Sequence, residues 1–518
     1  MLSFAVYMNG QPATRIDLAG AYVVGTDDVP LRAEIRFHNG IIRCNKRSAG
    51  PAGLALFWNV PSVGRFMLET VRLLERSKPY VLQVELTRSR LMRIHQKLED
   101  WGLLDSPEGA EDILNQITQS REMLVKALQA DTPAAAADLG NEALVLAVRA
   151  GEALTRFHAD DLLAKRKEAD GFGKRVLGCA VHTDDSPKTL SKRLIGSVDF
   201  VTVPIVWRAI EPKEQAFDWK PLDTWVESLA KQHVEMIGSA LLSFHERDVP
   251  DWLYIWEHDF DTIRDLAFEH IRRVIDRYDR YIHTWNVVSG LHAGNCFTFN
   301  FEQLMELTRM TAALAKQLAP NSLAVVDLVT PWGEYYARNQ RTIPPLLYAD
   351  MVVQSGVNFD AFGLKFHFGP AEDGMFVRDM FQISALLDLF SKLGKPLRIS
   401  AVGVPSASTP PKGGKSKSAA KAMIGKAGAA AVNAESPNGG VWHEPWSEAI
   451  QAEWLNRFLE VVLSKPFVES VSWHGLVDHE DQPIPCDGLL RADLQPKAAY
   501  EQFTRTRTEL HANSSECM

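Results

Sequence analysis

The sequence predicts an α/β protein built on a (β/α)8 barrel, the TIM barrel, preceded by a small antiparallel β domain and a helical connector. Two observations carry this prediction. After Gly171, eight short apolar segments alternate with amphipathic helical stretches to the end of the chain. Before Gly171, turn-rich β segments give way to a long region of helical periodicity. Strands that alternate with helices form parallel sheets, and eight of them close into a barrel.

The eight predicted strands are runs rich in Val, Ile, Leu, Phe and Trp that end in turn signals. They lie at residues 175–181, 199–207, 235–245, 281–288, 323–329, 359–367, 397–404 and 470–477. An open, doubly wound sheet is the alternative for such a pattern. No Gly-x-Gly-x-x-Gly motif follows any of these strands, which favours the barrel.

Two regions are predicted before the barrel, and one insertion is predicted within it. Residues 1–78 are predicted to form a small β-rich, sandwich-like domain, because Asn9-Gly10 and Asn39-Gly40 each sit between apolar runs as hairpin turns do. Residues 79–170 are predicted to be a helical connector, and the barrel is expected to span 171–510. Residues 406–440 are rich in Ala, Gly, Ser, Lys and Pro, which predicts a disordered insertion on the carboxyl-end side of the barrel.

Composition limits the classes of function. The 518 residues are 46% hydrophobic and 23% charged with a net charge of -9, which is typical of a globular protein and offers no basic surface for nucleic acid. No apolar run is long enough to cross a membrane, and the N-terminus lacks the basic start of a secretory signal. Five scattered cysteines indicate reduced thiols. We therefore expect a cytoplasmic protein with no membrane or nucleic-acid partner; the oligomeric state stays open.

Several strings, in order along residues 171–510, resemble family-10 glycoside hydrolases, the endo-β-1,4-xylanase family. The strings are WRAIEPKEQAFDWKPLD at 207–223, IGSALLSFHERDVPDWL at 237–253, FDAFGLKFHFG at 359–369, VESVSWHGLVDHE at 468–480 and GLLRADLQPKAAY at 488–500. The resemblance implies a barrel that acts on or binds an oligo- or polysaccharide, with no cofactor and no metal.

The same resemblance implies that the catalytic pair is missing. Family members hydrolyse with retention, using one glutamate after the fourth strand and one at the end of the seventh, about 5–5.5 Å apart. The matching strings here are Trp-Asn-Val-Val-Ser-Gly and Ile-Ser-Ala-Val-Gly. Gly290 stands at the acid/base position and Ala401 at the nucleophile position. Neither residue transfers a proton or forms a glycosyl ester.

Other positions that bind sugar in the family keep suitable side chains. Aromatic faces and neutral hydrogen-bonding groups are what a pyranose site needs. The substrate-binding candidates implied by the resemblance are His245, Trp252, Trp285, Lys365, His367, Trp473 and His474.

Two further chemical readings stay open. A carboxylate in a loop at the carboxyl end of the barrel could replace the lost pair, and Glu444, in the string VWHEPWSEAI, is the weak candidate. His245, His292 and His367 could in principle bind a metal, but no HxH or HExxH spacing supports it.

Three functions therefore compete. The first is a xylanase-like protein of carbohydrate metabolism that binds a saccharide in the barrel mouth without cleaving it, a pseudoenzyme. The second is an active hydrolase of O-glycosyl bonds that uses relocated carboxylates. The third is a non-catalytic structural or interaction scaffold. Fold alone does not separate them.

Overall fold

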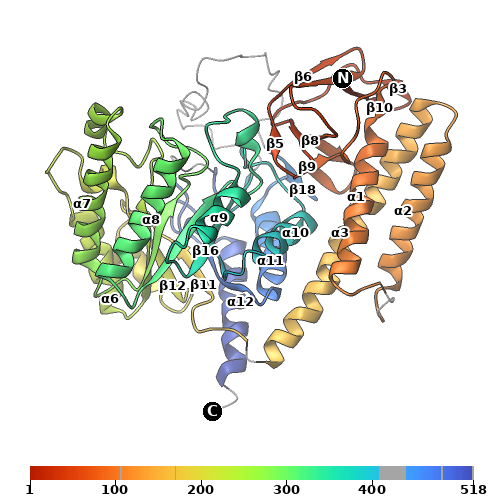
Figure 1. The fold of residues 1–518 in the computed structure, drawn as a ribbon. Coiled ribbons are helices and arrows are strands. Elements are labelled where there is room, and N and C mark those ends of the chain that lie inside the picture. The colour runs from red at the N-terminus through yellow and green to blue at the C-terminus, as the bar shows by residue number, and fades with distance from the viewer. Residues whose placement is uncertain (105–107, 170, 408–438, 480–481, 483, 516–518) are drawn as a thin grey trace.

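A closed barrel of eight parallel strands forms the centre of the molecule, as predicted. The computed structural model describes residues 1–104, 108–169, 171–407, 439–479, 482 and 484–515 (Figure 1). Around the barrel the strands follow one another in chain order. They are β11 (Leu177–Ala180), β12 (Phe200–Pro204), β13 (Glu235–Leu242), β14 (Thr284–Ser289), β15 (Leu323–Val329), β16 (Ala361–His367), β17 (Leu397–Gly403) and β19 (Val468–Trp473).

The barrel strands are apolar because both of their faces are covered. The six residues of β14 and the central five of β15 are all buried, as parallel strands under helices require. The helices after Gly171 are α4 (Pro187–Leu194), α5 (Trp207–Ile210), α6 (Lys220–Lys231), η1 (Asp251–Trp256), α7 (Phe260–Tyr278), α8 (Phe301–Leu318), η2 (Glu334–Ala337), α9 (Pro345–Gln354), α10 (Met380–Ser391), α11 (Glu448–Ser464) and α12 (Ala498–Ser515). Because all eight strands run parallel, their carboxyl ends meet at one rim.

The N-terminal region forms small sheets, and both predicted hairpins are present. Asn9-Gly10 and Asn39-Gly40 have positive φ at all four residues, the turn geometry that suits two-residue hairpins. One sheet has the order β10-β1-β7-β6 and is antiparallel except for the β1–β10 pair. The strands here are β1 (Leu2–Ala5), β2 (Tyr7–Met8), β3 (Gln11–Pro12), β4 (Tyr22–Val24), β5 (Pro30–Leu31), β6 (Ala33–His38), β7 (Ile41–Lys46), β8 (Gly53–Val60), β9 (Gly64–Glu69) and β10 (Tyr80–Val81).

Three long helices follow these sheets, where the connector was predicted. They are α1 (Leu82–Asp100), α2 (Glu111–Gln129) and α3 (Pro133–Glu168). Figure 1 shows them beside the N-terminal sheets on one side of the barrel. At the end of α3, Arg166 donates hydrogen bonds to the backbone oxygens of Leu463, Lys465 and Val468, so the helix is fixed to the barrel.

A short strand that follows the seventh barrel strand in the sequence completes the second N-terminal sheet. Its order is β18-β9-β8-β4-β5, and β18 (Val441–Trp442) pairs antiparallel with β9. The sheet is therefore built from two distant stretches of sequence. The division of the chain at residues 78 and 170 stays a prediction. Of the predicted insertion, residues 408–438 lie outside the described part of the chain.

The N-terminal sheets also hold the loops at the barrel rim. Arg378, after β16, is buried, forms an ion pair with the buried carboxylate of Glu334, and donates to the backbone oxygen of Met67 in β9 at 3.0 Å. Its guanidinium carbon lies 5.0 Å from the centre of the Trp332 ring. Loops after β15 and β16 are thus joined to the N-terminal unit through one buried cation.

Replacing Glu334 with Gln should lower the free energy of unfolding by about 3–5 kcal/mol, because Arg378 would remain buried without its charged partner. Urea denaturation of the full chain measures this loss. The control is Asp161→Asn, which breaks an exposed ion pair with Lys165 and should leave the stability nearly unchanged. Equal losses in the two variants would contradict the role assigned to Arg378.

Candidate functional site

The ends of β14 and β17, where the resemblance places the two catalytic glutamates, have no acidic side chain at the matching positions. Gly290 directly follows β14 and has a φ of +70°, which side-chain-bearing residues rarely adopt. A Cβ built there would lie 3.2 Å from Val329 Cγ2. Ala401 lies near the end of β17, buried, and is the direct neighbour of Lys365 in β16. Both positions belong to the carboxyl-end rim of the same barrel.

A carboxylate does lie inside the barrel, but it is fully paired. Asp327 of β15 has no exposed surface. Its Oδ1 accepts a hydrogen bond from Ser400 Oγ at 2.6 Å, and its Oδ2 accepts from Asn286 Nδ2 at 2.9 Å. Lys365 Nζ lies 3.1 Å from the same Oδ2. Side chains from four neighbouring strands therefore converge on one buried negative charge.

Lys365 lies on the outer side of this group, toward the opening. In register it is next to Val329, two residues nearer the carboxyl end than Asp327. Its side chain is 17% exposed, whereas that of Asp327 is 0% exposed. Lys365 Nζ also donates to Ser289 Oγ at 2.9 Å, at the last residue of β14. The positive end of the ion pair thus faces the mouth.

A second group joins the ends of β16 and β19. His474 Nδ1 lies 2.6 Å from Asp487 Oδ2, and the His474 ring centre is 4.5 Å from that of His367. Asp487 is fully buried. A Cβ at Gly403 would lie 2.9 Å from Asp487 Oδ2, so this carboxylate uses space that glycine leaves at the end of β17.

His367 is held neutral. Burial lowers its pKa well below the ordinary value, and the charges of His474 and Lys365 lower it further. The ring has one buried nitrogen, Nε2, without a hydrogen-bond partner among the described residues.

Other carboxylates after the barrel strands are also bound within the protein. Asp478 Oδ1 lies 2.7 Å from Lys497 Nζ, and Asp185 Oδ1 lies 3.1 Å from His479 Nε2. Glu211, after β12, accepts from Trp207 Nε1 at 3.0 Å through one oxygen and from a backbone N–H at 2.8 Å through the other. These three carboxylates are thus each held by a neighbouring side chain.

The comparisons with known proteins name the family. A family model described as glycosyl hydrolase family 10 matches residues 172–504. The chain belongs to glycosyl hydrolase family 10. This match covers the barrel and leaves out strands β1–β10 and helices α1–α3.

Individual relatives are distant. Over 87 residues the chain is 30% identical to endo-1,4-β-xylanase C of Paenibacillus barcinonensis, covering 16% of this chain and 8% of that protein. Over 89 residues it is 29% identical to a β-1,4-xylanase of Dictyoglomus thermophilum, covering 17% of this chain and 24% of the relative. The chain therefore spans less than two thirds of either curated relative.

Solved family structures are similar at low sequence identity. Xylanase 10B of Thermotoga petrophila RKU-1 in complex with xylobiose has a TM-score of 0.47 and 15% identity, covering 67% of this chain and 96% of that one. A family-10 protein from Paenibacillus barcinonensis has a TM-score of 0.47 and 17% identity, covering 65% and 95%.

Of the seven substrate-binding candidates, three lie together at the mouth of this family-10 barrel: Lys365, His367 and His474. Trp473 lies beside them but is fully buried, and its Nε1 donates to the backbone oxygen of Asp487 at 2.8 Å. Trp473 therefore packs beneath the site and has no exposed surface for a ligand to contact.

Trp285 is also placed away from the mouth. Asn286 points into the barrel toward Asp327, so alternation along the strand turns Trp285 to the opposite face. Its side chain is fully buried, and a Cβ at Gly238 would lie 2.5 Å from its ring. Trp285 thus packs in the core, and its role in substrate binding stays a prediction.

The two candidates after β13 lie apart from this group. Trp252 is half-buried in η1 and donates from Nε1 to the backbone oxygen of Glu211 at 2.9 Å. His245 is exposed, and its Nδ1 accepts from the Arg247 N–H at 3.3 Å. These contacts show turn-stabilising roles and leave part of each ring open.

Glu444 lies at the edge of the N-terminal sheet. It follows β18, its side chain is exposed, and its N–H bonds the backbone oxygen of Trp442 at 2.7 Å. The adjacent His443 Nε2 lies 2.7 Å from Glu152 Oε2 in α3. Burial lowers the pKa of His443, but the bond to Glu152 outweighs this, and the pKa is raised. The segment that contains His443 and Glu444 thus contacts α3 through His443.

No group of three or more potential metal ligands occurs among the described residues. His292, one of the three histidines considered for a metal, is buried, and its Nε2 bonds the Val329 backbone oxygen at 3.1 Å. Within the same described parts of the chain, no helix is long and apolar enough to span a membrane, and no cysteine forms a disulfide.

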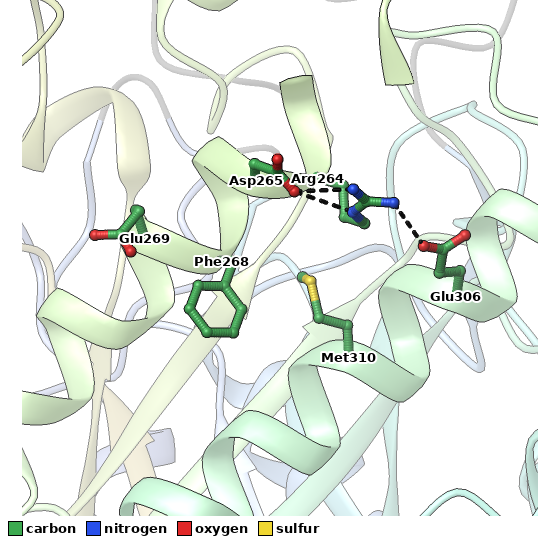
Figure 2. Close-up of a pocket in the computed structure, with 6 residues that line it drawn as sticks. All are labelled: Arg264, Asp265, Phe268, Glu269, Glu306 and Met310. Atoms are coloured by element: carbon green, nitrogen blue, oxygen red, sulfur yellow. Dashed lines mark hydrogen bonds and ion pairs between the residues drawn. The ribbon is translucent and has the colours of Figure 1, made fainter. Parts of the chain in front are cut away.

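In the described part of the chain, cavities are found outside the mouth. One, of about 450 Å³, lies between α7 and α8 on the outer layer, where Arg264 bridges Asp265 and Glu306 next to Phe268 and Met310 (Figure 2). The other, of about 650 Å³, is formed by residues 298–301 and 336–347, in the loops that follow β14 and β15. The second cavity therefore lies on the carboxyl-end side of the barrel.

Acid should destabilise the protein partly through His367. The unfolded chain protonates this residue below about pH 6.5, whereas the folded protein keeps it neutral, so the stability is lost as the pH falls from that value. The loss is at most about 1.4 kcal/mol per pH unit for one such group. His367→Gln should show a smaller fall in unfolding free energy between pH 7 and 5 than the native chain. Parallel curves would contradict the neutral, buried state of His367.

Proposed function

We propose that this protein is a family-10 member that binds a saccharide at the barrel mouth and no longer hydrolyses it by the family's mechanism. One observation carries the proposal. The two strand ends expected to hold the catalytic glutamates hold Gly290 and Ala401. The buried carboxylate of Asp327 accepts two side-chain hydrogen bonds and forms an ion pair with Lys365.

The chemistry of retaining hydrolysis explains why this matters. It needs one carboxylate that reaches the anomeric carbon and a second carboxyl group, about 5–5.5 Å away, that protonates the leaving oxygen. Asp327 and Asp487 are both fully buried. A carboxylate without exposed surface reaches neither a sugar carbon nor a leaving oxygen.

Groups suited to binding are present at the same rim. Lys365 and the 20%-exposed ring of His474 offer hydrogen bonds toward the opening. Outside the mouth, on the same carboxyl-end side of the barrel, the cavity of about 650 Å³ places Phe301 and Tyr336 next to Asn300 and Gln340. Aromatic surface beside amide and hydroxyl groups is the usual composition of a sugar site. Because two relatives are named β-1,4-xylanases and one solved relative holds xylobiose, xylo-oligosaccharides are the first ligands to test.

A hydrolase with relocated carboxylates is the second candidate, and one observation favours it. Asp487 has an oxygen, Oδ1, that is buried without a hydrogen-bond partner among the described residues. It lies at the end of β17, close to where the family keeps its nucleophile. Asp487, rather than Glu444, is therefore the carboxylate to replace.

The full chain should bind xylobiose or xylotriose by calorimetry and release no measurable product from chromogenic β-xylosides. General acid/base groups contribute about 10²–10⁴-fold in rate, and this chain lacks the usual pair. Release that disappears in Asp487→Asn but persists in Glu444→Gln would favour the second candidate. Absence of saccharide binding would contradict the proposed function.

Restoring both glutamates should not restore hydrolysis. Gly290→Glu would place a side chain on a backbone with a φ of +70°, with its Cβ 3.2 Å from Val329, so the new acid would be strained out of position. Ala401→Glu would meet the ammonium of Lys365 and form an ion pair. Xyloside hydrolysis by the double variant would contradict this account of the two positions.

A further inference from the structure

We propose that β6 is a dimerisation edge, which pairs antiparallel with β6 of a second copy of this chain about a two-fold axis at Ile35. Two copies of a four-stranded sheet then join into one continuous sheet. This inference goes beyond the proposed function, because it concerns strands β1–β10, which lie outside the family match.

β6 lies at one end of its sheet. The strand order is β10-β1-β7-β6, and β7 is the strand that pairs with β6 among the described residues. In Figure 1 the β6 label stands near the top of the molecule. A strand at the end of a sheet has a row of backbone N–H and C=O groups without partners, and these groups can pair with another chain.

The register of the β6–β7 hairpin shows which backbone groups of β6 point outward. The turn at Asn39-Gly40 places His38 opposite Ile41. In a hairpin with a two-residue turn, the residues that flank the turn form a hydrogen-bonded pair, and such pairs alternate along the strands. The bond from Val6 N–H to Gly40 O, 2.8 Å long, has the parity that this pattern requires. The residues of β6 whose N–H and C=O groups point to the free edge are therefore Ala33, Ile35 and Phe37.

The sequence of β6 matches itself when two copies run antiparallel. With Ile35 opposite its counterpart, Glu34 of each copy lies opposite Arg36 of the other, and Ala33 lies opposite Phe37. The backbone allows this register, because every outward-pointing residue then lies opposite another outward-pointing residue. Pairs of opposite charge and pairs of β-branched or aromatic side chains both stabilise neighbouring strands.

The charged face of β6 needs the negative charge that a second copy supplies. Arg36, 76% exposed, lies directly opposite Arg43 of β7, and like charges in this position destabilise a sheet. Arg36 pairs with Glu34 of its own strand, but such an exposed pair contributes little. Arg43 forms no ion pair in the described part of the chain. Glu34 of a second copy would lie beside Arg36 and compensate the two arginines.

β6 also lacks the usual protection of an edge strand. Proteins commonly protect such strands with prolines, bulges or several lysines. β6 contains neither proline nor lysine, and its pairing with β7 has no shift in register. The outward-pointing residues Ala33, Ile35 and Phe37 are only half-buried. A second copy would cover these apolar side chains, which favours a strand of the same sequence as the occupant of this edge.

The oligomeric state of the full chain tests the pairing. Sedimentation velocity over a wide range of protein concentration should show a reversible equilibrium between monomer and dimer. No larger species should form through β6, because a two-fold interface uses the free edge of both copies. A native chain that stays monomeric at every concentration would overturn the proposal and leave this edge to a different segment.

Charge variants test the register. Glu34→Arg and Arg36→Glu each place like charges opposite one another on both sides of the axis, so each variant alone should dimerise at least about tenfold more weakly than the native chain. Mixed in equal amounts, the two variants should form a mixed dimer, because a basic strand then lies opposite an acidic one. Thermal melting checks that each variant folds.

A matched control separates this effect from a change in net charge. Arg47→Glu changes the charge as Arg36→Glu does, but Arg47 is exposed beyond the end of β7 and should leave the dimerisation unchanged. Equal weakening by Arg47→Glu and Arg36→Glu would overturn the proposal. Dimers that are insensitive to both β6 variants, or a mixture that does not dimerise, would also overturn it, while the proposed saccharide binding would stand.

Discussion

The buried carboxylate of Asp327 is the interaction on which the mouth of the barrel depends. An ionised group without exposed surface is costly unless donors and an opposite charge compensate it. Here Asn286, Ser400 and Lys365 supply that compensation from β14, β17 and β16. Gly363 is part of the same arrangement, because a Cβ there would collide with the Asp327 carboxylate and with Ser400 Oγ. The polar side chains inside the barrel therefore compensate the charge of Asp327, and Lys365 is the member of this group that has exposed surface.

The N-terminal unit limits how freely the rim can move. Its sheet takes in β18 from the chain that follows β17, and Arg378 joins Glu334 to the backbone of β9. Loops after β15, β16 and β17 are thus tied to structure outside the barrel. Catalytic loops in barrels usually vary and move. In this molecule, the loops after three of the eight barrel strands are tied to strands β1–β10, which lie outside the family match.

Much of the fold could be predicted, since it depends on local patterns. The strand-helix alternation located all eight barrel strands, and Asn-Gly pairs located two hairpins. The pairing of β18 with β9 could not be predicted, because nothing local in Val441–Trp442 records a partner so far back in the chain. Asp327 could have been found: a charged residue inside the run LAVVDLV is a signal that a buried polar group needs partners.

The site was only partly predictable for similar reasons. Lys365, His367 and His474 lie near strand ends, and strand ends in a parallel barrel meet by geometry. The burial of Trp285 could not be predicted, because a resemblance gives a position in the sequence but not the face of the strand. Asp487 comes from a loop, and its place depends on the absence of a side chain at Gly403, a relation between two distant residues.

The central claim is that this barrel holds an intact saccharide where its relatives would cut one. A crystal structure of the native chain, grown with a xylo-oligosaccharide over several days, tests it most directly. The account predicts an uncleaved chain whose glycosidic bond lies over Gly290 and Ala401, with Lys365 and His474 in hydrogen-bonding contact. Cleaved sugar in the mouth, or an oligosaccharide bound only elsewhere on the molecule, would contradict it.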